Sequence, residues 1–378
     1  MGDPHRVGIV GLGHISGAYL GTLANHPGVT ITAVADLDPS RSAAVAAALP
    51  TARALPVEDL LAGEVQTVLN LTVPAAHASV ALGAIGHSLH VYGEKPLAAS
   101  LEEASVIVSA ASAAGLTVGC APDTVLGTGI QTARAFVDGG GIGRPVAASA
   151  VMVTPGHERW HPNPDFYYLP GGGPLLDMGP YYLSALVHLL GPIRSVTGAS
   201  SRPRDQRVIG TGPRAGSPVP VEVDTHVTGI LEHDGGALST ITTSFDAVRT
   251  TAAPIEVHGE TGTLAVPDPN RFDGDVRLFE LGASEWRVLP PSAGYAEAAR
   301  GIGLLDQIAY GQTTDGQTIG GRTASGAPRA SGDLALHILD AMTALLRSSA
   351  EGRRIDLTTT VERPPLVPLT PRSEWSGG

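Results

Sequence analysis

The sequence predicts an α/β protein of two domains: an N-terminal Rossmann domain with a doubly wound parallel sheet, and a C-terminal α+β domain with an open, largely antiparallel sheet. Three observations predict this organisation. A glycine-rich turn follows the first apolar run, strands and helices alternate over the first third, and hairpin patterns follow residue 223. The length of 378 residues suits two domains, which we expect at residues 1–123 for dinucleotide binding and 124–378 for substrate binding.

The composition narrows the class of protein. Hydrophobic residues make up 43% and charged residues 16%, so a sizeable core can form. The net charge of −12 argues against nucleic acid or an anionic membrane as a partner. Cys120 is the single cysteine, so no internal disulfide is possible, and no apolar run reaches membrane-spanning length. We therefore expect a cytoplasmic protein without a leader peptide.

The first strand and the turn after it predict a nucleotide cradle. A β-type run leads into residues 11–16, GLGHIS, which follow the pattern G-x-G-x-x-small. Gly11 permits the tight turn, Gly13 allows a pyrophosphate to approach the backbone, and Ser16 lets the helix pack closely on the strand. The helix that follows offers N–H groups and a positive dipole end to phosphate. The predicted cofactor contacts here are Gly11, Gly13, His14, Ile15 and Ser16.

A second strand is predicted at residues 30–35 and ends at Asp36. An acid roughly 20 residues past the glycines is placed to bind the ribose 2′-OH, and its charge would repel a 2′-phosphate. Asp36 therefore favours NAD over NADP. Arg41 could stack on adenine or lie near a 2′-phosphate, so NADP remains possible. A purely turn-forming role for Asp36 is the alternative.

Helices and strands then alternate. We expect helices at residues 40–49, 57–61, 75–85 and 101–114, and strands at residues 67–71, 89–92 and 116–120. Right-handed crossovers bring the carboxyl ends of parallel strands to one edge, so Gly11, Thr72 and Lys95 share that edge. The further cofactor candidates at this edge are Thr72, Pro74, His77, Glu94 and Lys95.

Lys95 is the residue around which we expect the chemistry to be arranged. It lies just past a buried strand, beside Glu94, and Pro96 fixes the direction of the chain. Ligands of open parallel sheets bind at this end of the strands. The plain alternative is a surface lysine, but the neighbouring glycine turn favours a role in chemistry.

The middle of the chain contains a second group of candidates. After a helix expected at residues 124–137 and a strand at 146–153, residues 157–168 are rich in aromatic and polar side chains. Such residues suit the faces and hydroxyls of sugars. The candidates for substrate binding are Trp160, His161, Asp165 and Tyr167. His157 and His161 have the i,i+4 spacing of metal ligands, but nearby prolines disfavour a helix and no third ligand is in register, so we expect no metal. An aromatic-packed loop is the alternative.

Three glycines at residues 171–173 precede an apolar helix that we expect to begin with Asp177 as its N-cap and to end before Gly191. Asp177 and Tyr181 lie on one face of this helix, and Ser184 and His188 extend that face. Tyrosine can give or take a proton where a nearby cation, here Lys95, favours its charged form. Capping and packing alone are the alternative roles.

The last part of the chain predicts loops and hairpins. We expect loops at residues 196–220 and 311–330, the second of them mobile, and an extended tail after residue 363. The predicted strand pairs are 223–232 with 237–245, 254–258 with 262–266, and 276–281 with 286–289. A closing helix is expected at residues 334–346.

Together, the motifs at residues 11–16, at Asp36, at 94–96 and at 171–181 resemble the glucose–fructose oxidoreductase, inositol dehydrogenase and rhizopine catabolism (Gfo/Idh/MocA) family over nearly the whole chain. The resemblance implies that Lys95 is the catalytic lysine and Asp177 the acid of an Asp-x-Gly motif. Many members have His where Tyr181 stands. With tyrosine at this position, the sequence resembles the branch of the family that includes glucose–fructose oxidoreductase and dihydrodiol dehydrogenase. The resemblance also implies a sheet with one face covered by helices and the other used for oligomer contacts.

We therefore expect an NAD(P)-dependent oxidoreductase that acts on a sugar, a sugar derivative or a cyclitol. Lys95, Asp177 and Tyr181 would be catalytic, all three would contact substrate, and the protein would be a homodimer or homotetramer. Two alternatives remain. One is an enzyme that cleaves glycosides through transient oxidation of the sugar by tightly held NAD, and the other is a non-catalytic sensor of dinucleotide and sugar.

Overall fold

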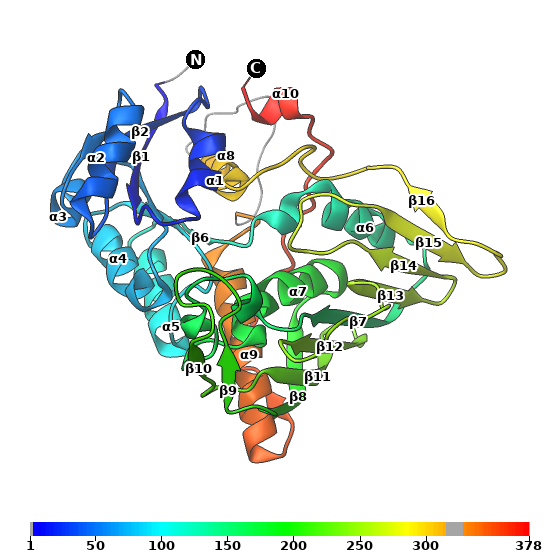
Figure 1. Ribbon diagram of the computed structural model, residues 1–378. Helices are drawn as coiled ribbons and strands as arrows, with labels where there is room; N and C mark the ends of the chain where they lie inside the picture. The colour runs from blue at the N-terminus through cyan, green and yellow to red at the C-terminus, as the bar shows by residue number, and fades with distance from the viewer. Residues whose placement is uncertain (1–2, 315–327, 378) are drawn as a thin grey trace. The chain divides into compact units, whose positions relative to one another are not determined.

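The computed structural model describes residues 3–314 and 328–377. The chain divides into two compact units, each built from separate stretches of sequence (Figure 1). Unit 1 comprises Met1–Gly127, Tyr295–Leu336 and Val367–Gly378, and unit 2 comprises Thr128–Gly294 and His337–Leu366. The chain first leaves unit 1 after Gly127, and two later segments return to it.

Unit 1 contains a six-stranded sheet in the order β3-β2-β1-β4-β5-β6, and its strand pairs are parallel. The strands are β1 His5–Val10, β2 Val29–Ala35, β3 Arg53–Ala54, β4 Thr67–Asn70, β5 His90–Gly93 and β6 Val118–Cys120. The order reverses between β1 and β4, which makes this the point where a doubly wound sheet binds its ligand. The predicted parallel Rossmann sheet is thereby confirmed.

Helices and short turns complete unit 1. They are α1 Ser16–Leu23, α2 Pro39–Ala48, α3 Val57–Leu61, α4 Pro74–Gly86, α5 Leu101–Ala113, the 3-10 turn η1 Thr124–Leu126, α8 Ile302–Thr314 and α10 Arg372–Trp375. Side chains cap two of them, since Asp38 accepts from the Ser40 N–H and Ser100 from the Glu103 N–H. Val7, Ile9, Val68 and others on the central strands are fully buried, as expected for strands covered on both faces.

Two expectations at the boundaries of unit 1 were wrong. The helix predicted at residues 124–137 is divided into η1 and α6 Thr128–Asp138, because Gly127 is extended and forms a β-bridge with Tyr295. The loop predicted at residues 311–330 starts too early, since α8 continues to Thr314. Residues 315–327 of that predicted loop lie outside the described residues.

Unit 2 contains a nine-stranded sheet in the order β16-β15-β14-β13-β7-β12-β11-β8-β17. The strands are β7 Pro145–Val153, β8 Ile193–Ser201, β11 His226–His233, β12 Leu238–Ser244, β13 Ile255–Gly259, β14 Gly262–Val266, β15 Val276–Glu280, β16 Arg287–Leu289 and β17 Ile355–Asp356. Only the β7–β12 pair within this sheet of the described chain is parallel. The predicted open, largely antiparallel sheet is confirmed.

Helices cover one face of the large sheet (Figure 1). They are α6, α7 Pro174–Leu190 and α9 Gly332–Glu351, of which the part from His337 onward belongs to unit 2. Alternate residues such as Ile241 and Leu231 are buried under them. On the opposite face Ile230 and Leu238 are about half exposed, at 49% and 50%. The sheet therefore has one buried and one open face.

The loop predicted at residues 196–220 was wrong in large part. It contains the end of β8 and a two-stranded ribbon of β9 Gln206–Val208 and β10 Pro218–Pro220. Gly198 lies under α9, where a Cβ atom would stand 2.3 Å from the Leu345 carbonyl oxygen. The glycine therefore permits close strand–helix packing.

The start of α7 also differs from the prediction. Gly173, with φ of 95°, precedes the first helical residue Pro174, so Asp177 lies within the first turn and is not the N-cap. Pro180 is inside the helix. The Gly173 N–H donates to the Tyr167 carbonyl, which fixes the chain before the helix. Asp177 is thereby left to make side-chain contacts other than capping.

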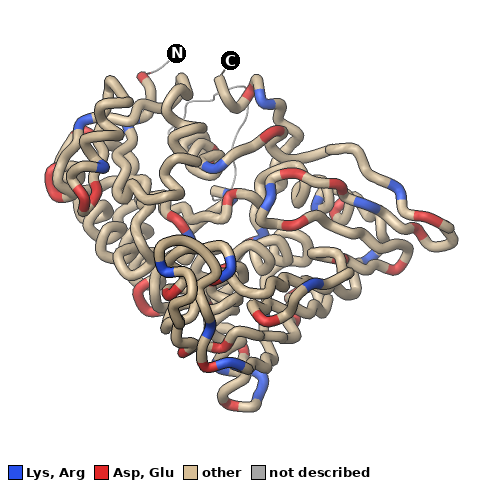
Figure 2. Tube along the Cα trace, in the orientation of Figure 1, with Lys and Arg blue, Asp and Glu red and all other residues tan. Residues whose placement is uncertain are grey.

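Acidic and basic residues are distributed over both units without long runs of one sign (Figure 2). Figure 2 shows acidic and basic residues interspersed along the chain of both units. Several of them form ion pairs, such as Arg194 with Glu232 at 2.9 Å. No helix in residues 3–314 and 328–377 has both the length and the apolar character needed to cross a bilayer.

Candidate active site

The glycine turn of unit 1 is shaped by close backbone packing. Gly11 has φ of +93°, and a Cβ atom there would lie 2.6 Å from the Leu71 carbonyl carbon, so a side chain is excluded. At Gly13 a Cβ atom would meet nothing within 4 Å, which leaves room for a ligand against the backbone. The Ser16 hydroxyl donates to the Gly13 carbonyl at 2.7 Å and holds the turn.

The N-terminus of α1 fits a dinucleotide pyrophosphate. Ile15 stands at its N-cap position with no side-chain hydrogen bond to the helix, and the first turn contains no acidic residue. The first N–H groups of a helix and its dipole attract phosphate where no side chain competes. Together with the open space at Gly13, this end of the helix can hold the pyrophosphate of NAD(P).

Asp36 follows β2 and is bonded to the glycine turn. Its Oδ2 accepts from the Leu12 N–H at 2.6 Å, and its Oδ1 accepts from the Asp38 N–H at 2.8 Å. Arg41 Nη1 lies 4.0 Å from Asp36 Oδ1, and the Arg41 side chain is 55% exposed. The structure therefore gives Asp36 the turn-forming role and places it beside the glycine turn and Arg41, while its contact with the ribose stays a prediction.

His77 connects the two loops that follow β4 and β5. Its side chain is buried, with Nδ1 2.6 Å from the Pro96 carbonyl oxygen and Nε2 3.0 Å from the Thr72 carbonyl oxygen. Both ring nitrogens thus meet backbone oxygens, which suits a role in holding the loops. Pro74 begins α4, whose N-terminus has no side-chain cap.

The backbone at Lys95 is held by Glu94. The Glu94 carboxylate accepts from the Tyr19 hydroxyl of α1 at 2.7 Å and from the Lys95 N–H at 3.1 Å. Burial and the negative charge of Glu94 raise the pKa of Tyr19, so the phenol keeps its proton and remains a donor. Tyr19 is a supporting residue that the sequence analysis missed, although its place one turn into α1 was visible.

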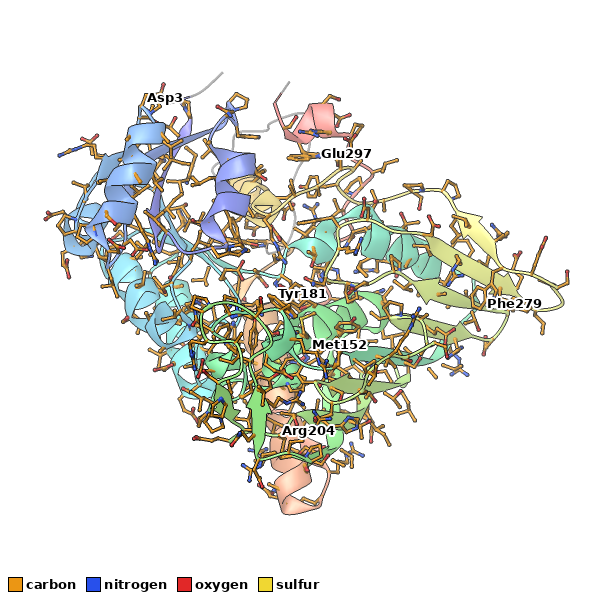
Figure 3. All side chains as sticks on the ribbon, in the orientation of Figure 1. Asp3, Met152, Tyr181, Arg204, Phe279 and Glu297 are labelled. Carbon is orange, nitrogen blue, oxygen red and sulfur yellow. The ribbon has the colours of Figure 1, made fainter. Side chains whose placement is uncertain are left out.

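In unit 2, one face of α7 runs from the surface into the core. Figure 3 labels Tyr181 on this helix. The Asp177 side chain is 19% exposed, Tyr181 is 6% exposed, and Ser184 and His188 are almost fully buried. His188 Nδ1 lies 3.3 Å from the Gln131 side-chain nitrogen. The outer end of the face therefore remains the candidate for chemistry, and the inner end belongs to the core.

Asp177 is paired with His157, a contact that the sequence analysis missed. His157 Nε2 lies 3.2 Å from Asp177 Oδ2, and the Trp160 indole N–H donates to His157 Nδ1 at 3.3 Å. The rings of Tyr167 and Phe245 pack against the imidazole with centroids 4.6 and 4.4 Å away. The structure thus brings Trp160, Tyr167 and Asp177 together around His157.

The other two candidates of this loop have partners of their own. Asp165 forms a bidentate ion pair with Arg214 at 2.5 and 2.9 Å, and these hydrogen bonds lower the pKa of Asp165. His161 Nδ1 accepts from the Asn163 N–H at 3.1 Å. No group of three metal-ligating side chains occurs in the described ranges 3–314 and 328–377.

A buried polar network holds the loop of residues 157–168, which we call the aromatic loop. The Tyr168 hydroxyl donates to Glu158 and accepts from the His157 N–H at 3.0 Å. Arg207, whose side chain is 1% exposed, pairs with Glu158 at 3.1 Å and also with Asp246. Burial and Glu158 raise the pKa of Tyr168. Both charges of the buried pair are compensated, so the network can hold the loop in one conformation.

Unit 1 combines a doubly wound parallel sheet, a glycine turn, an uncapped helix N-terminus and an acid after the second strand. Together they define a dinucleotide-binding Rossmann protein. Two family models match the chain: "Oxidoreductase family, NAD-binding Rossmann fold" at residues 5–121, and "GFO/IDH/MocA C-terminal domain" at residues 130–265. The chain belongs to the GFO/IDH/MocA family of oxidoreductases, as the resemblance implied.

Curated relatives and solved structures agree with this family. The chain is 31% identical over 317 residues to dTDP-3,4-didehydro-2,6-dideoxy-alpha-D-glucose 3-reductase of Streptomyces antibioticus, which covers 82% of this chain and 90% of the relative. It is 35% identical over 156 residues to inositol 2-dehydrogenase 3 of Saccharopolyspora erythraea, covering 40% of this chain and 45% of the relative. An NAD-binding oxidoreductase from Klebsiella pneumoniae has the same fold, with a TM-score of 0.79, 22% identity, and coverage of 95% and 100%.

These findings confirm that the chain is an NAD(P)-dependent oxidoreductase whose relatives are dehydrogenases and reductases of sugars and cyclitols. NAD(P) is its cofactor, and the glycine turn, the α1 N-terminus and Asp36 are the residues that fit it. The individual catalytic and binding roles remain predictions.

Proposed function

We propose that this enzyme transfers a hydride between nicotinamide and a secondary alcohol or ketone of a sugar, a sugar derivative or a cyclitol. The observation that carries the proposal is the 31% identity to a sugar 3-reductase over 82% of this chain and 90% of that relative. The match to an inositol 2-dehydrogenase supports cyclitols as further candidates. The net charge of −12 supports a small-molecule substrate over a nucleic acid.

The catalytic residues that we propose are Lys95, Asp177 and Tyr181. Bound NAD(P) supplies the hydride acceptor or donor. Tyr181 exchanges the proton of the reacting hydroxyl, and Lys95 donates a hydrogen bond to the substrate. Asp177 accepts a hydrogen bond from a hydroxyl of the substrate and so orients it. Trp160 and Tyr167 pack against an apolar face of the ring.

The test is NADH or NADPH formation by the purified protein with NAD, NADP and a panel of pyranoses, glycosides and cyclitols, together with the reverse assay on the matching ketones. Oxidation or reduction of at least one member is expected. Release of an alcohol or phenol from a glycoside without net NADH would instead establish the glycosidase reaction. Cofactor binding without turnover across the panel and its ketones would contradict the proposal.

We also propose that the protein forms a homodimer or homotetramer in the cytoplasm. The open face of the nine-stranded sheet supports the assembly, because its centre carries small or uncharged residues such as Thr228, Ile230, Thr240 and Thr242. Arginine in place of Thr240 is expected to lower the molar mass measured by light scattering. Arginine in place of Thr250, in an exposed loop, serves as the control. An unchanged mass for both variants would place the contact elsewhere.

A further inference from the structure

His157 occupies an enclosed position beside Asp177. Its side chain is 11% exposed, and three aromatic rings surround the imidazole: Trp160 at 5.1 Å, Tyr167 at 4.6 Å and Phe245 at 4.4 Å between centroids. The Trp160 ring meets it edge-on, at an interplanar angle of 62°. A ring held on several sides in this way has little freedom to turn, so its two nitrogens keep their partners.

The partners of the two nitrogens define the tautomer of His157. An indole N–H can only donate, so Nδ1, which receives the Trp160 N–H at 3.3 Å, must present its lone pair. In a neutral imidazole the proton is then on Nε2. Nε2 lies 3.2 Å from Asp177 Oδ2, so the Nε2–H donates to the carboxylate. Trp160 thereby determines the direction of the hydrogen bond to Asp177.

The backbone of His157 is held as firmly as its ring. Its N–H donates to the Tyr168 hydroxyl at 3.0 Å, and that hydroxyl donates to the buried Glu158. Arg207 anchors Glu158 from the ribbon of β9 and β10. The aromatic loop is therefore connected to Asp177 by a chain of hydrogen bonds that starts in a buried ion pair.

We propose that His157 is a positioning residue for the reaction: its Nε2–H holds the Asp177 carboxylate in the orientation that binds a substrate hydroxyl, and the Trp160 indole holds the imidazole in the tautomer that can donate. This inference rests on the proposed role of Asp177. It assigns Trp160 a second function besides contact with the sugar. It also makes the aromatic loop part of the catalytic arrangement of α7, and not solely a specificity element.

Two substitutions separate donation from packing. His157→Leu keeps an apolar side chain among the aromatic rings but removes the donor. His157→Gln places an amide N–H at the distance of Nε2 and restores it. We expect His157→Leu to lower kcat at least about tenfold with NAD affinity unchanged, and His157→Gln to stay within about threefold of wild type. His87→Gln, an exposed histidine at the end of α4, is the control. Equal kcat for His157→Leu and wild type would overturn the proposal, while wild-type turnover would still support the proposed function.

A second measurement does not depend on turnover. In long-range ¹H–¹⁵N spectra of the histidine side chains, the signals absent from His157→Gln identify His157. The wild type is expected to show the neutral Nε2–H tautomer, Asp177→Asn to shift its Nε2 signal, and Trp160→Phe to convert it to a mixture of tautomers. A wild-type ring protonated on Nδ1 would refute the inference even if no substrate were known.

Discussion

At the scale of single residues, Asp36 does two things that a sequence motif cannot separate. Its carboxylate accepts from the backbone of the glycine turn and also carries a charge where the ribose is expected. Arg41 stands within 4.0 Å of it and is largely exposed. The preference for NAD over NADP therefore depends on the charge of Asp36, while the shape of the turn depends on its oxygens.

Asparagine at position 36 keeps one acceptor oxygen and removes the charge. We expect Asp36→Asn to raise kcat/KM for NADP relative to NAD by about tenfold or more, because a carboxylate repels a 2′-phosphate at short range. The measurement is steady-state kinetics with both cofactors. Asp38→Asn is the matched control, since Asp38 also lies near Arg41, at 3.5 Å, but caps α2. If Asp36→Asn left the ratio of kcat/KM for NADP to kcat/KM for NAD unchanged, Asp36 would not contact the ribose.

Lys95 provides the second prediction at this scale. Lys95→Met keeps the length of the side chain and removes its donor and charge. We expect kcat to fall by about 10² or more, as for loss of a group that acts on the reacting hydroxyl, and the Kd for NAD to change by less than about threefold. Turnover comes from initial rates and Kd from fluorescence titration of the cofactor. Unaltered turnover in a folded Lys95→Met protein would remove Lys95 from the mechanism.

Some functional residues could be placed from the sequence and others could not, and the reason is physical. Gly11, Asp36 and Lys95 follow strands closely, so a short motif fixes their place at the edge of the sheet. The pair of His157 and Asp177 joins a loop to a helix 20 residues away, and no spacing rule connects them. In the sequence His157 has only the i,i+4 spacing of metal ligands with His161, for which we expect no metal, and nothing there indicates its actual partners, an indole and a carboxylate.

At the scale of elements, the close packing of α9 on β8 determines which residues the strand can contain. Gly198 and Gly229 are adjacent on β8 and β11, and Leu345 of α9 lies over both. The helix also bonds to the strand directly, because the Ser348 hydroxyl accepts from the Gly198 N–H at 2.9 Å. Glycine thus lets the helix approach the backbone of the sheet, and the residue composition of β8 comes to resemble that of a loop.

A methyl group at position 198 is expected to disturb this contact. Its Cβ would stand 2.3 Å from the Leu345 carbonyl oxygen, and backbone atoms cannot turn away as a side chain can. We expect Gly198→Ala to lower the free energy of unfolding by about 2 kcal/mol or more. Urea unfolding followed by tryptophan fluorescence measures it. In Gly235→Ala the nearest atom would be 3.9 Å away, so this control should remain within about 0.5 kcal/mol of wild type.

Much of the fold at this scale could be predicted from the sequence. Apart from the short β3, which was not predicted, the strands of unit 1 and the hairpins from β11 onward follow apolar periodicity and turn residues, and their observed bounds lie close to the expected ones. The segment at residues 196–220 could not, because Gly198 and Ser200 make contacts with α9, which is distant in sequence. The N-cap of α7 was misplaced because a hydrogen bond of Gly173 to the loop sets it.

At the scale of the whole molecule, buried and partly buried histidines make the free energy of unfolding depend on pH. Burial, with His90 and Arg6 adding to it, lowers the pKa of His5 to about 4. Burial also lowers the pKa of His233 and His337. Each of these groups binds a proton in the unfolded chain below about pH 6.5, but only at lower pH in the folded one. Their contribution to stability is therefore present above about pH 6.5 and is lost as the pH falls towards the lowered pKa of each group, which for His5 is about 4.

This dependence can be measured at His5. We expect the free energy of unfolding to decrease between pH 7 and pH 4.5, and His5→Gln to remove about 1–2 kcal/mol of that decrease, an amount reduced by the partial exposure of the ring. Urea titrations at several pH values provide the comparison. His87→Gln, at an exposed site, should keep the wild-type slope. If the free energy of unfolding changed equally with pH in His5→Gln and in wild type, His5 would titrate alike in the folded and unfolded states.

Unit 1 is assembled from three separate stretches of the chain, and this affects when the unit can fold during synthesis. The buried carboxylate of Asp123 accepts from the N–H groups of Gly301 and Gly303 and pairs with Arg300. While the ribosome is still translating residues 128–294, those partners do not yet exist. All six strands of the Rossmann sheet are made early, but unit 1 lacks these hydrogen bonds and the rest of its later segments until residues 295–336 and 367–378 have been synthesised. We therefore expect newly made chains to need chaperones for longer than a protein whose nucleotide-binding domain is built from one continuous N-terminal stretch.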